Sequence, residues 1–148
     1  MALIKSISGI RGTIGGNTAN NLTPLDIVKF TAAYGSWLLN RNKSSPKVVI
    51  GRDGRISGSM VQNLVVNTLI GLGINVVDLG FSTTPTVELA VIWEKAAGGI
   101  IITASHNPKE WNALKLLDNN GEFINAVHGA VVFEKASKED FTFVPVDK

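Results

Sequence analysis

Apolar residues occur along the chain in short continuous runs, and longer amphipathic stretches separate these runs. Three runs have the length and the branched residues of buried strands: KVVIG at 47–51, INVVDLG at 74–80 and GGIIITA at 98–104. Buried strands that alternate with helices are typical of βαβ units and of a sheet covered on both faces. The pattern therefore predicts the α/β class, with a mostly parallel mixed sheet sandwiched between helices.

Helices are predicted where apolar residues recur at spacings of three and four. The first begins at Pro24, behind a Thr23 cap, and runs to about Asn40. Its core face is expected to consist of Leu25, Val28, Ala32, Gly35 and Leu39. The other helices are expected to begin at a Ser57 cap, to run from Thr84-Pro85 to about Lys95, and to span about 126–136. A loosely alternating segment, ALKLLD at 113–118, ends at a turn signal.

The composition fits one globular domain. The 148 residues are 45% apolar and include no cysteine, which excludes intrinsic disorder and a disulfide scaffold. The most apolar stretch, 64–80, is interrupted by polar residues, so no membrane span is expected. The start, MALIKSISG, has too short an apolar run for a secretory signal, and a cytoplasmic location is expected. The end, DFTFVPVDK, resembles a chain that leaves one domain for the next, so residues 1–148 are expected to be the N-terminal domain of a longer protein.

The net charge of +2 hides an uneven distribution. Lysine and arginine prevail in the first half of the chain, and aspartate and glutamate prevail in the second. The basic half suits an anionic ligand, although two ordinary solvated faces would give the same distribution. The basic residues are scattered and only 7% of the chain is aromatic, which argues against nucleic acid as a partner.

The sequence ITASHNP at 102–108 carries the strongest chemical signal. Ser105 follows a predicted buried strand, at the edge where parallel sheets bind their ligands. A hydroxyl fixed there is a candidate nucleophile or phosphate carrier, and a simple polar turn is the alternative. A hydrolase triad fits poorly, because no G-x-S-x-G elbow is present and the adjacent Ser105 and His106 point apart. The other histidine, His128, lies in a predicted helix and is interpreted as structural.

Four motifs together resemble the N-terminal domain of the α-D-phosphohexomutases, which include the phosphoglucomutases and phosphomannomutases. ITASHNP is similar to the phosphoserine loop of that family. The other three motifs appear in the family's order: SGIRG at 8–12, GRDGR at 51–55 and NALK at 112–115. The resemblance covers essentially the whole chain.

The resemblance implies that Ser105 carries a phosphoryl group in the active enzyme. That group would pass to a hexose phosphate of glucose or mannose, and the resulting bisphosphate would return its other phosphate to Ser105, which exchanges the 1- and 6-positions. In the family, a Mg²⁺ contacts the serine phosphate and is otherwise bound by an Asp-Gly-Asp-x-Asp-Arg loop of a later domain. No such run exists here, so metal binding by this chain is expected only through the Ser105 phosphate, and the chain alone is expected to be inactive.

The same resemblance implies the other site residues. Lys115 matches a lysine assigned to acid/base work on the sugar hydroxyl. Arg11, expected on a glycine-flanked loop, matches an arginine near the transferring phosphate. His106 matches a residue that orients the substrate or moves a proton. Ser8 is expected to line the site, and Asn107 is expected to steady the serine loop and contact the substrate.

The GRDGR motif is interpreted differently, because an aspartate between two arginines can pair within its own loop. Arg52, Asp53 and Arg55 are therefore expected to brace neighbouring loops. Ala113 stands where the family usually has glycine, and alanine would be strained there if the backbone needed a positive φ.

Two other functions are compatible with the motifs. A phosphoglucosamine mutase would share the chemistry, but such enzymes usually have serine where Thr103 stands, which favours glucose or mannose phosphates. A non-catalytic phosphosugar-binding domain would keep the fold and would have no need of a phosphate on Ser105.

Overall fold

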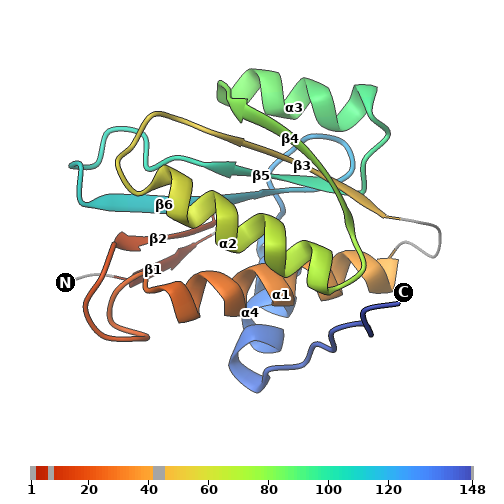
Figure 1. Ribbon diagram of the computed structural model, residues 1–148, viewed down its shortest axis with the longest axis horizontal. Helices are drawn as coiled ribbons and strands as arrows, with labels where there is room; N and C mark the ends of the chain where they lie inside the picture. The colour runs from red at the N-terminus through yellow and green to blue at the C-terminus, as the bar shows by residue number, and fades with distance from the viewer. Residues whose placement is uncertain (1–2, 7–8, 42–45, 148) are drawn as a thin grey trace.

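The computed structural model describes residues 3–6, 9–41 and 46–147, and these residues form an α/β sandwich (Figure 1). Across them, six strands form one mixed sheet in the order β1-β2-β6-β5-β3-β4. The strands are β1 (Leu3–Ser6), β2 (Gly9–Thr13), β3 (Lys47–Arg52), β4 (Asn75–Phe81), β5 (Gly98–Ile102) and β6 (Trp111–Leu117). The helices are α1 (Pro24–Arg41), α2 (Gly58–Gly71), α3 (Thr84–Trp93) and α4 (Ala126–Lys138). The predicted α/β class and mixed sheet are confirmed.

The direction of each strand follows from what connects it to its neighbour. Strand β3 is parallel to β4 and to β5, because α2 and α3 cross over between these strands. Strand β6 returns antiparallel to β5 after a loop that contains no helix, and β2 then pairs antiparallel with β6. Three of the five pairings between these strands are antiparallel, so the prediction that the sheet is mostly parallel was wrong in this respect.

The N-terminal strands are a feature that the apolar pattern did not predict. Arg11, expected on a loop, lies in β2, where its neighbour across the ladder is Ala113 of β6. The close approach of the two strands requires glycine at position 9, where φ is +123° and a Cβ would collide with the carbonyl oxygen of Leu114. Pairing with a distant strand therefore decides the conformation of a segment whose own sequence reads as a turn.

Helices α1, α2 and α4 cover one face of the sheet, and the larger core lies between them (Figure 1). The predicted apolar face of α1 was wrong in part, since Leu25 is 67% exposed. Ala32 and Gly35 of the predicted face are buried, and the buried side of the helix also includes Ile27, Phe30, Tyr34, Trp37 and Leu38. The buried side is wide because α1 packs against both α2 and α4, and because the Tyr34 hydroxyl donates to the Leu117 carbonyl of β6 at 2.6 Å.

The first helix has a complete cap. The Thr23 hydroxyl donates to the Asp26 carboxylate at 2.6 Å, and the Thr23 amide donates to the same carboxylate at 3.0 Å. Helix α2 differs from its prediction, because the Ser57 side chain makes no capping bond to the helix. Its hydroxyl instead accepts a hydrogen bond from Nδ2 of the fully buried Asn112 at 2.9 Å, which links the start of α2 to β6.

Helix α3 covers only part of the opposite face. It packs mainly on β3 and β5, around a smaller core that includes Val49, Ile101 and Val91. Figure 1 shows α3 alone on this side of the sheet, over the end that contains β3 and β4. The same face of β2 and β6 has no helix over it among the described residues, and Arg11 and Lys115 lie there. In the part of the chain that the structure describes, no helix is long and apolar enough to span a membrane.

Candidate active site

Two loops meet at the carboxyl edge of the parallel strands, as the sequence predicts. The loop of residues 53–57 follows β3, and the loop of residues 103–110 follows β5. The Asp53 amide donates to the Ile102 carbonyl at 3.2 Å, so the ladder between the two strands continues into the loops. The GRDGR and ITASHNP motifs are therefore in contact.

Ser105 is held in an unusual backbone conformation just beyond β5. Its φ is +53°, a left-handed value that costs a residue other than glycine about 1 kcal/mol. The Thr103 hydroxyl accepts a hydrogen bond from the Ser105 amide at 3.1 Å and donates to Oδ2 of Asp53 at 2.5 Å. Thr103 thus ties the serine loop to the GRDGR loop, a role that the sequence analysis missed although the residue lies within the serine motif. The side chain of Ser105 is exposed.

Lys115 makes direct contact with the serine. Its Nζ donates to Oγ of Ser105 at 2.6 Å. The alternation of β6 places it there, because Leu114 and Leu116 point into the larger core and Lys115 points to the other face. Partial burial lowers the pKa of Lys115 below its ordinary value, the positive charge of Arg11 lowers it further, and the charge of Asp53 opposes the shift. The shift enlarges the neutral fraction of Lys115 at a given pH.

Arg11 and Lys115 form a basic pair on one face of adjacent strands. Arg11 is exposed and faces the same side as Lys115, because its ladder partner Ala113 lies two residues before Lys115. A guanidinium and an ammonium beside a hydroxyl suit the oxygen atoms of a phosphoryl group. Ala113 is buried in β6 and is not among the described residues with positive φ, so the alanine at this position causes no backbone strain.

Arg55 braces the serine loop from the neighbouring loop. Its guanidinium donates to the carbonyl oxygens of Ser105 and Asn107, both at 2.8 Å. Its Nε lies 3.5 Å from Oδ2 of Asp53, an ion pair within the GRDGR motif as expected. Arg52 points elsewhere: it donates to Gln62, and its guanidinium lies 4.3 Å from the centre of the Phe81 ring.

The remaining predicted residues lie around this centre. His106 is exposed next to Ser105. Asn107 is half-buried, and its amide donates to the Ala104 carbonyl at 3.0 Å, which closes the turn. Ser8 lies outside the described residues.

The residues around Ser105 do not by themselves fit a divalent cation. Among the described residues, no group of three or more histidine, aspartate or glutamate side chains is arranged to bind a metal ion. Lys115 contacts the Ser105 hydroxyl, and Arg11 lies near Lys115 on the same face of the sheet, so this basic pair repels a third positive charge. A Mg²⁺ in the family's reaction would need ligands from outside this chain.

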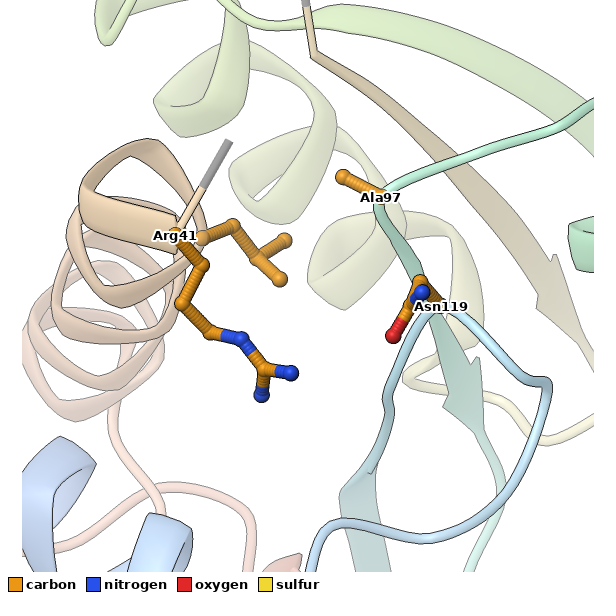
Figure 2. A pocket seen from close by; sticks show the side chains of 4 residues that line it. Arg41, Ala97 and Asn119 are labelled. Atoms are coloured by element: carbon orange, nitrogen blue, oxygen red, sulfur yellow. The ribbon is translucent and has the colours of Figure 1, made fainter. Parts of the chain in front are cut away.

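A small hollow at the opposite edge of the sheet is separate from this site (Figure 2). It has a volume of about 100 Å³ and is lined by Leu38, Arg41, Ala97 and Asn119. Ala97 precedes β5 and Asn119 follows β6, so the hollow lies at the far ends of the strands from Ser105. Nearby, the His128 ring packs 5.1 Å from that of Trp37, in agreement with a structural role for this histidine.

Comparisons with known proteins agree with the motifs. The family described as "Phosphoglucomutase/phosphomannomutase, alpha/beta/alpha domain I" matches residues 3–143. A phosphoglucomutase/phosphomannomutase from Thermococcus kodakarensis is 39% identical over 132 residues, which are 88% of this chain and 29% of the relative. A phosphoglucosamine mutase from Levilactobacillus brevis is 38% identical over 117 residues, 76% of this chain and 25% of the relative.

Solved structures give the same result. A phosphoglucomutase/phosphomannomutase family protein from Burkholderia thailandensis has a TM-score of 0.76 at 25% identity, over 95% of this chain and 32% of that one. The present chain therefore spans less than a third of the length of these relatives.

Proposed function

Because the chain belongs to the phosphoglucomutase/phosphomannomutase family and matches its α/β/α domain I, we propose that it supplies the nucleophilic serine of a phosphohexomutase. Ser105 carries the phosphoryl group, and the reaction exchanges the 1- and 6-positions of a hexose phosphate through a hexose bisphosphate. The observation that carries the proposal is the 2.6 Å contact between Nζ of Lys115 and Oγ of Ser105 at the open edge of the sheet. The remaining domains of the complete protein would complete the site.

The proposed roles of Lys115 and Arg11 follow from their charges and from their positions near Ser105. When the phosphoryl group passes to the sugar, the bond between phosphorus and Oγ of Ser105 breaks, and a bond from phosphorus to a sugar hydroxyl oxygen forms. Lys115, whose lowered pKa enlarges its neutral fraction, accepts the proton of that hydroxyl and passes a proton to the departing Oγ of Ser105, which its Nζ contacts at 2.6 Å. When the other phosphate returns to Ser105, Lys115 takes the proton from Oγ and passes it to the departing sugar oxygen. Arg11 stabilises the negative charge on the transferring oxygens, which is the main demand of phosphoryl transfer.

His106 and Asn107 are proposed to contact the sugar, since both lie in the exposed turn beside Ser105. Ser8, which precedes β2, is proposed to line the same site. A Mg²⁺ would supply additional charge neutralisation at the serine phosphate, and its protein ligands would come from another domain. The cytoplasmic location stays a prediction of the sequence.

The test is the chemical state and the necessity of Ser105 in the complete protein. Peptide mass spectrometry of protein purified from cells should find one phosphate on Ser105. Ser105→Ala should abolish turnover of glucose 1-phosphate while the thermal unfolding midpoint stays near that of the wild type. Ser59→Ala is the matched control, because Ser59 is an exposed serine in the first turn of α2. A phosphate found on a different serine, or an active Ser105→Ala protein, contradicts the proposal.

An amino sugar is the second candidate substrate, favoured by the number of phosphoglucosamine mutases among the relatives. The sequence points the other way through Thr103. Comparing kcat/KM for glucose 1-phosphate, mannose 1-phosphate and glucosamine 1-phosphate with the complete protein decides between them. A phosphosugar-binding domain without catalysis would show binding of all or some of these sugars, no turnover and no phosphate on Ser105.

A further inference from the structure

We propose that Arg55 is a positioning residue for phosphoryl transfer: its guanidinium holds the serine loop in the conformation that presents Oγ of Ser105 to Lys115. The inference rests on the proposed function of Ser105 and assigns a role to a residue that touches neither the hydroxyl nor the reacting group. Arg55 is expected to control the rate of transfer, and to have little influence on the binding of the sugar.

The side chain of Arg55 makes four contacts with the backbone around Ser105. Nη1 of Arg55 donates to the carbonyl oxygens of Pro108 at 2.7 Å and Trp111 at 3.1 Å. Nη2 donates to those of Ser105 and Asn107, both at 2.8 Å. Three carbonyls of the serine loop and that of Trp111, the first residue of β6, therefore surround a single guanidinium that lies 50 to 56 positions earlier in the sequence.

The positive charge of Arg55 also stabilises this arrangement of carbonyl oxygens. Four carbonyl oxygens that converge on one point carry partial negative charges that repel one another unless a cation with several donors sits between them. A guanidinium presents five N–H groups in a fixed plane, whereas an ammonium is a compact point charge with three donors. The carboxylate of Asp53, 3.5 Å from Nε of Arg55, balances the charge of the guanidinium. The side chain of Arg55 is only 12% exposed, so water screens these contacts weakly.

Ser105, the proposed nucleophile, has a strained backbone conformation that Arg55 helps to hold. Ser105 has φ of +53°, and its own carbonyl is one of the four that Arg55 binds. A left-handed serine persists only if its surroundings impose that conformation. On one side of the residue the Thr103 hydroxyl binds the Ser105 amide, and on the other Arg55 binds the carbonyl. Without Arg55 the residue is free to relax, and Oγ moves away from Nζ of Lys115.

The experiment compares two arginines of the same motif in the complete protein. Arg55→Lys keeps the charge and removes the planar fork, and we expect kcat to fall by about 10², the scale of a misplacement of about 1 Å. KM should change by less than about threefold, the pattern of an interaction that matters in the transition state only. Arg52→Lys is the matched control, because Arg52 contacts Gln62 and Phe81 and no carbonyl of the serine loop. It should keep kcat within about threefold of the wild type.

A rescue experiment separates positioning from general structure. In Arg55→Ala, millimolar guanidinium chloride, far below denaturing concentrations, should restore part of the lost kcat by occupying the space among the four carbonyls. Urea has the same planar shape and no charge, and it should not restore activity. If Arg55→Ala does not fold, Arg55→Lys decides alone.

Hydrogen exchange provides a readout that does not depend on turnover. The backbone amides of residues 105–107 and 109–111 should exchange faster in Arg55→Lys than in the wild type, and Arg52→Lys should leave them unchanged. Unchanged exchange together with a kcat near that of the wild type overturns the proposal. So does a loss of activity that a lower unfolding midpoint explains and guanidinium does not rescue. A wild-type protein with no phosphate on Ser105 contradicts the proposed function itself, and exchange then still shows whether Arg55 holds the loop.

Discussion

The two faces of the sheet give neighbouring residues of the same strands opposite environments. In β2, Ile10 is fully buried against the three-helix side, and Arg11 is exposed on the other side. In β6, Leu114 is buried in the larger core, while Lys115 reaches Ser105 on the face that α3 leaves open. One face of β2 and β6 thus supplies packing, and the other supplies charge.

Stability and chemistry therefore depend on opposite faces of the same strands. Alternate residues point to opposite faces, so a polar site can be built without removing any side chain from the core. The arrangement depends on register, because a slip of one residue would bury Lys115 and expose Leu114. The ladder fixes that register through Ile10 opposite Leu114 and Arg11 opposite Ala113. Substitutions on the two faces should therefore have separable effects.

The largest effect is expected on the open face. Lys115→Met in the complete protein should lower kcat by about 10² to 10⁴, the range for loss of a positioned acid/base group. The variant should remain folded, because the methionine chain occupies the same surface without the charge. Lys109→Met is the control, since Lys109 is an exposed lysine in the loop that contains Ser105. Steady-state kinetics measure kcat, and thermal unfolding shows whether the variant remains folded. A Lys115→Met protein with normal kcat would contradict the acid/base role of Lys115.

The next effect is expected on the packed face. Leu114→Ala should lower the free energy of unfolding by about 2–5 kcal/mol, because a cavity forms in the larger core. Urea denaturation of the 148-residue chain measures this value. Leu25→Ala, on the exposed side of α1, should change it by no more than about 0.5 kcal/mol. Similar values for both variants would show that the two positions are not as differently packed as the structure indicates.

The smallest effect concerns pH. Folding lowers the pKa of Lys115 below its ordinary value of 10.5. At a pH below the lowered pKa, Lys115 is charged in both the folded and the unfolded chain. Folding then carries the full cost of partly burying this charge. Lys115→Met removes this cost, and the variant should be slightly more stable than the wild type at neutral pH. The difference should shrink as pH rises toward 10.5, where the unfolded lysine also loses its proton. Urea denaturation of both proteins between neutral pH and this value tests the trend, and a difference that grows with pH would reverse the sign of the shift.

The parts of the fold that depend on local sequence were predictable. The apolar runs gave β3, β4 and β5, and the caps at Thr23 and Asn125 agree with the predicted starts of α1 and α4. Strands β1 and β2 were not predictable in this way, because Gly9–Thr13 contains two glycines and one apolar residue, and β2 is held as a strand by its pairing with β6. The hydroxyl of Ser57 likewise serves a distant partner, Asn112, in place of its own helix.

The candidate site likewise contains residues that the sequence predicted and contacts that depend on the three-dimensional fold. Ser105 could be placed at the carboxyl edge because it directly follows a strand of continuous apolar residues. The family resemblance pointed to Lys115, and the alternation of β6 brings it to the serine. The four carbonyl contacts of Arg55 could not be predicted, because they depend on the path of a loop that encloses the side chain. The hydrogen bonds of Thr103 to Asp53 and Ser105 could not be predicted either, because they depend on how two loops meet in the folded chain.

The pairing of β2 with β6 also affects the order in which the chain is completed. Synthesis begins at the N-terminus, so β1 and β2 leave the ribosome long before Leu114, the partner of Ile10, has been made. A two-stranded hairpin alone is marginally stable in water. The first strands to be synthesised are therefore among the last to join the sheet, and Arg11 reaches Lys115 only when β6 is complete. A chain truncated before Trp111 would keep its parallel strands and helices α1 to α3, and would lack the partner that holds its own N-terminus in place.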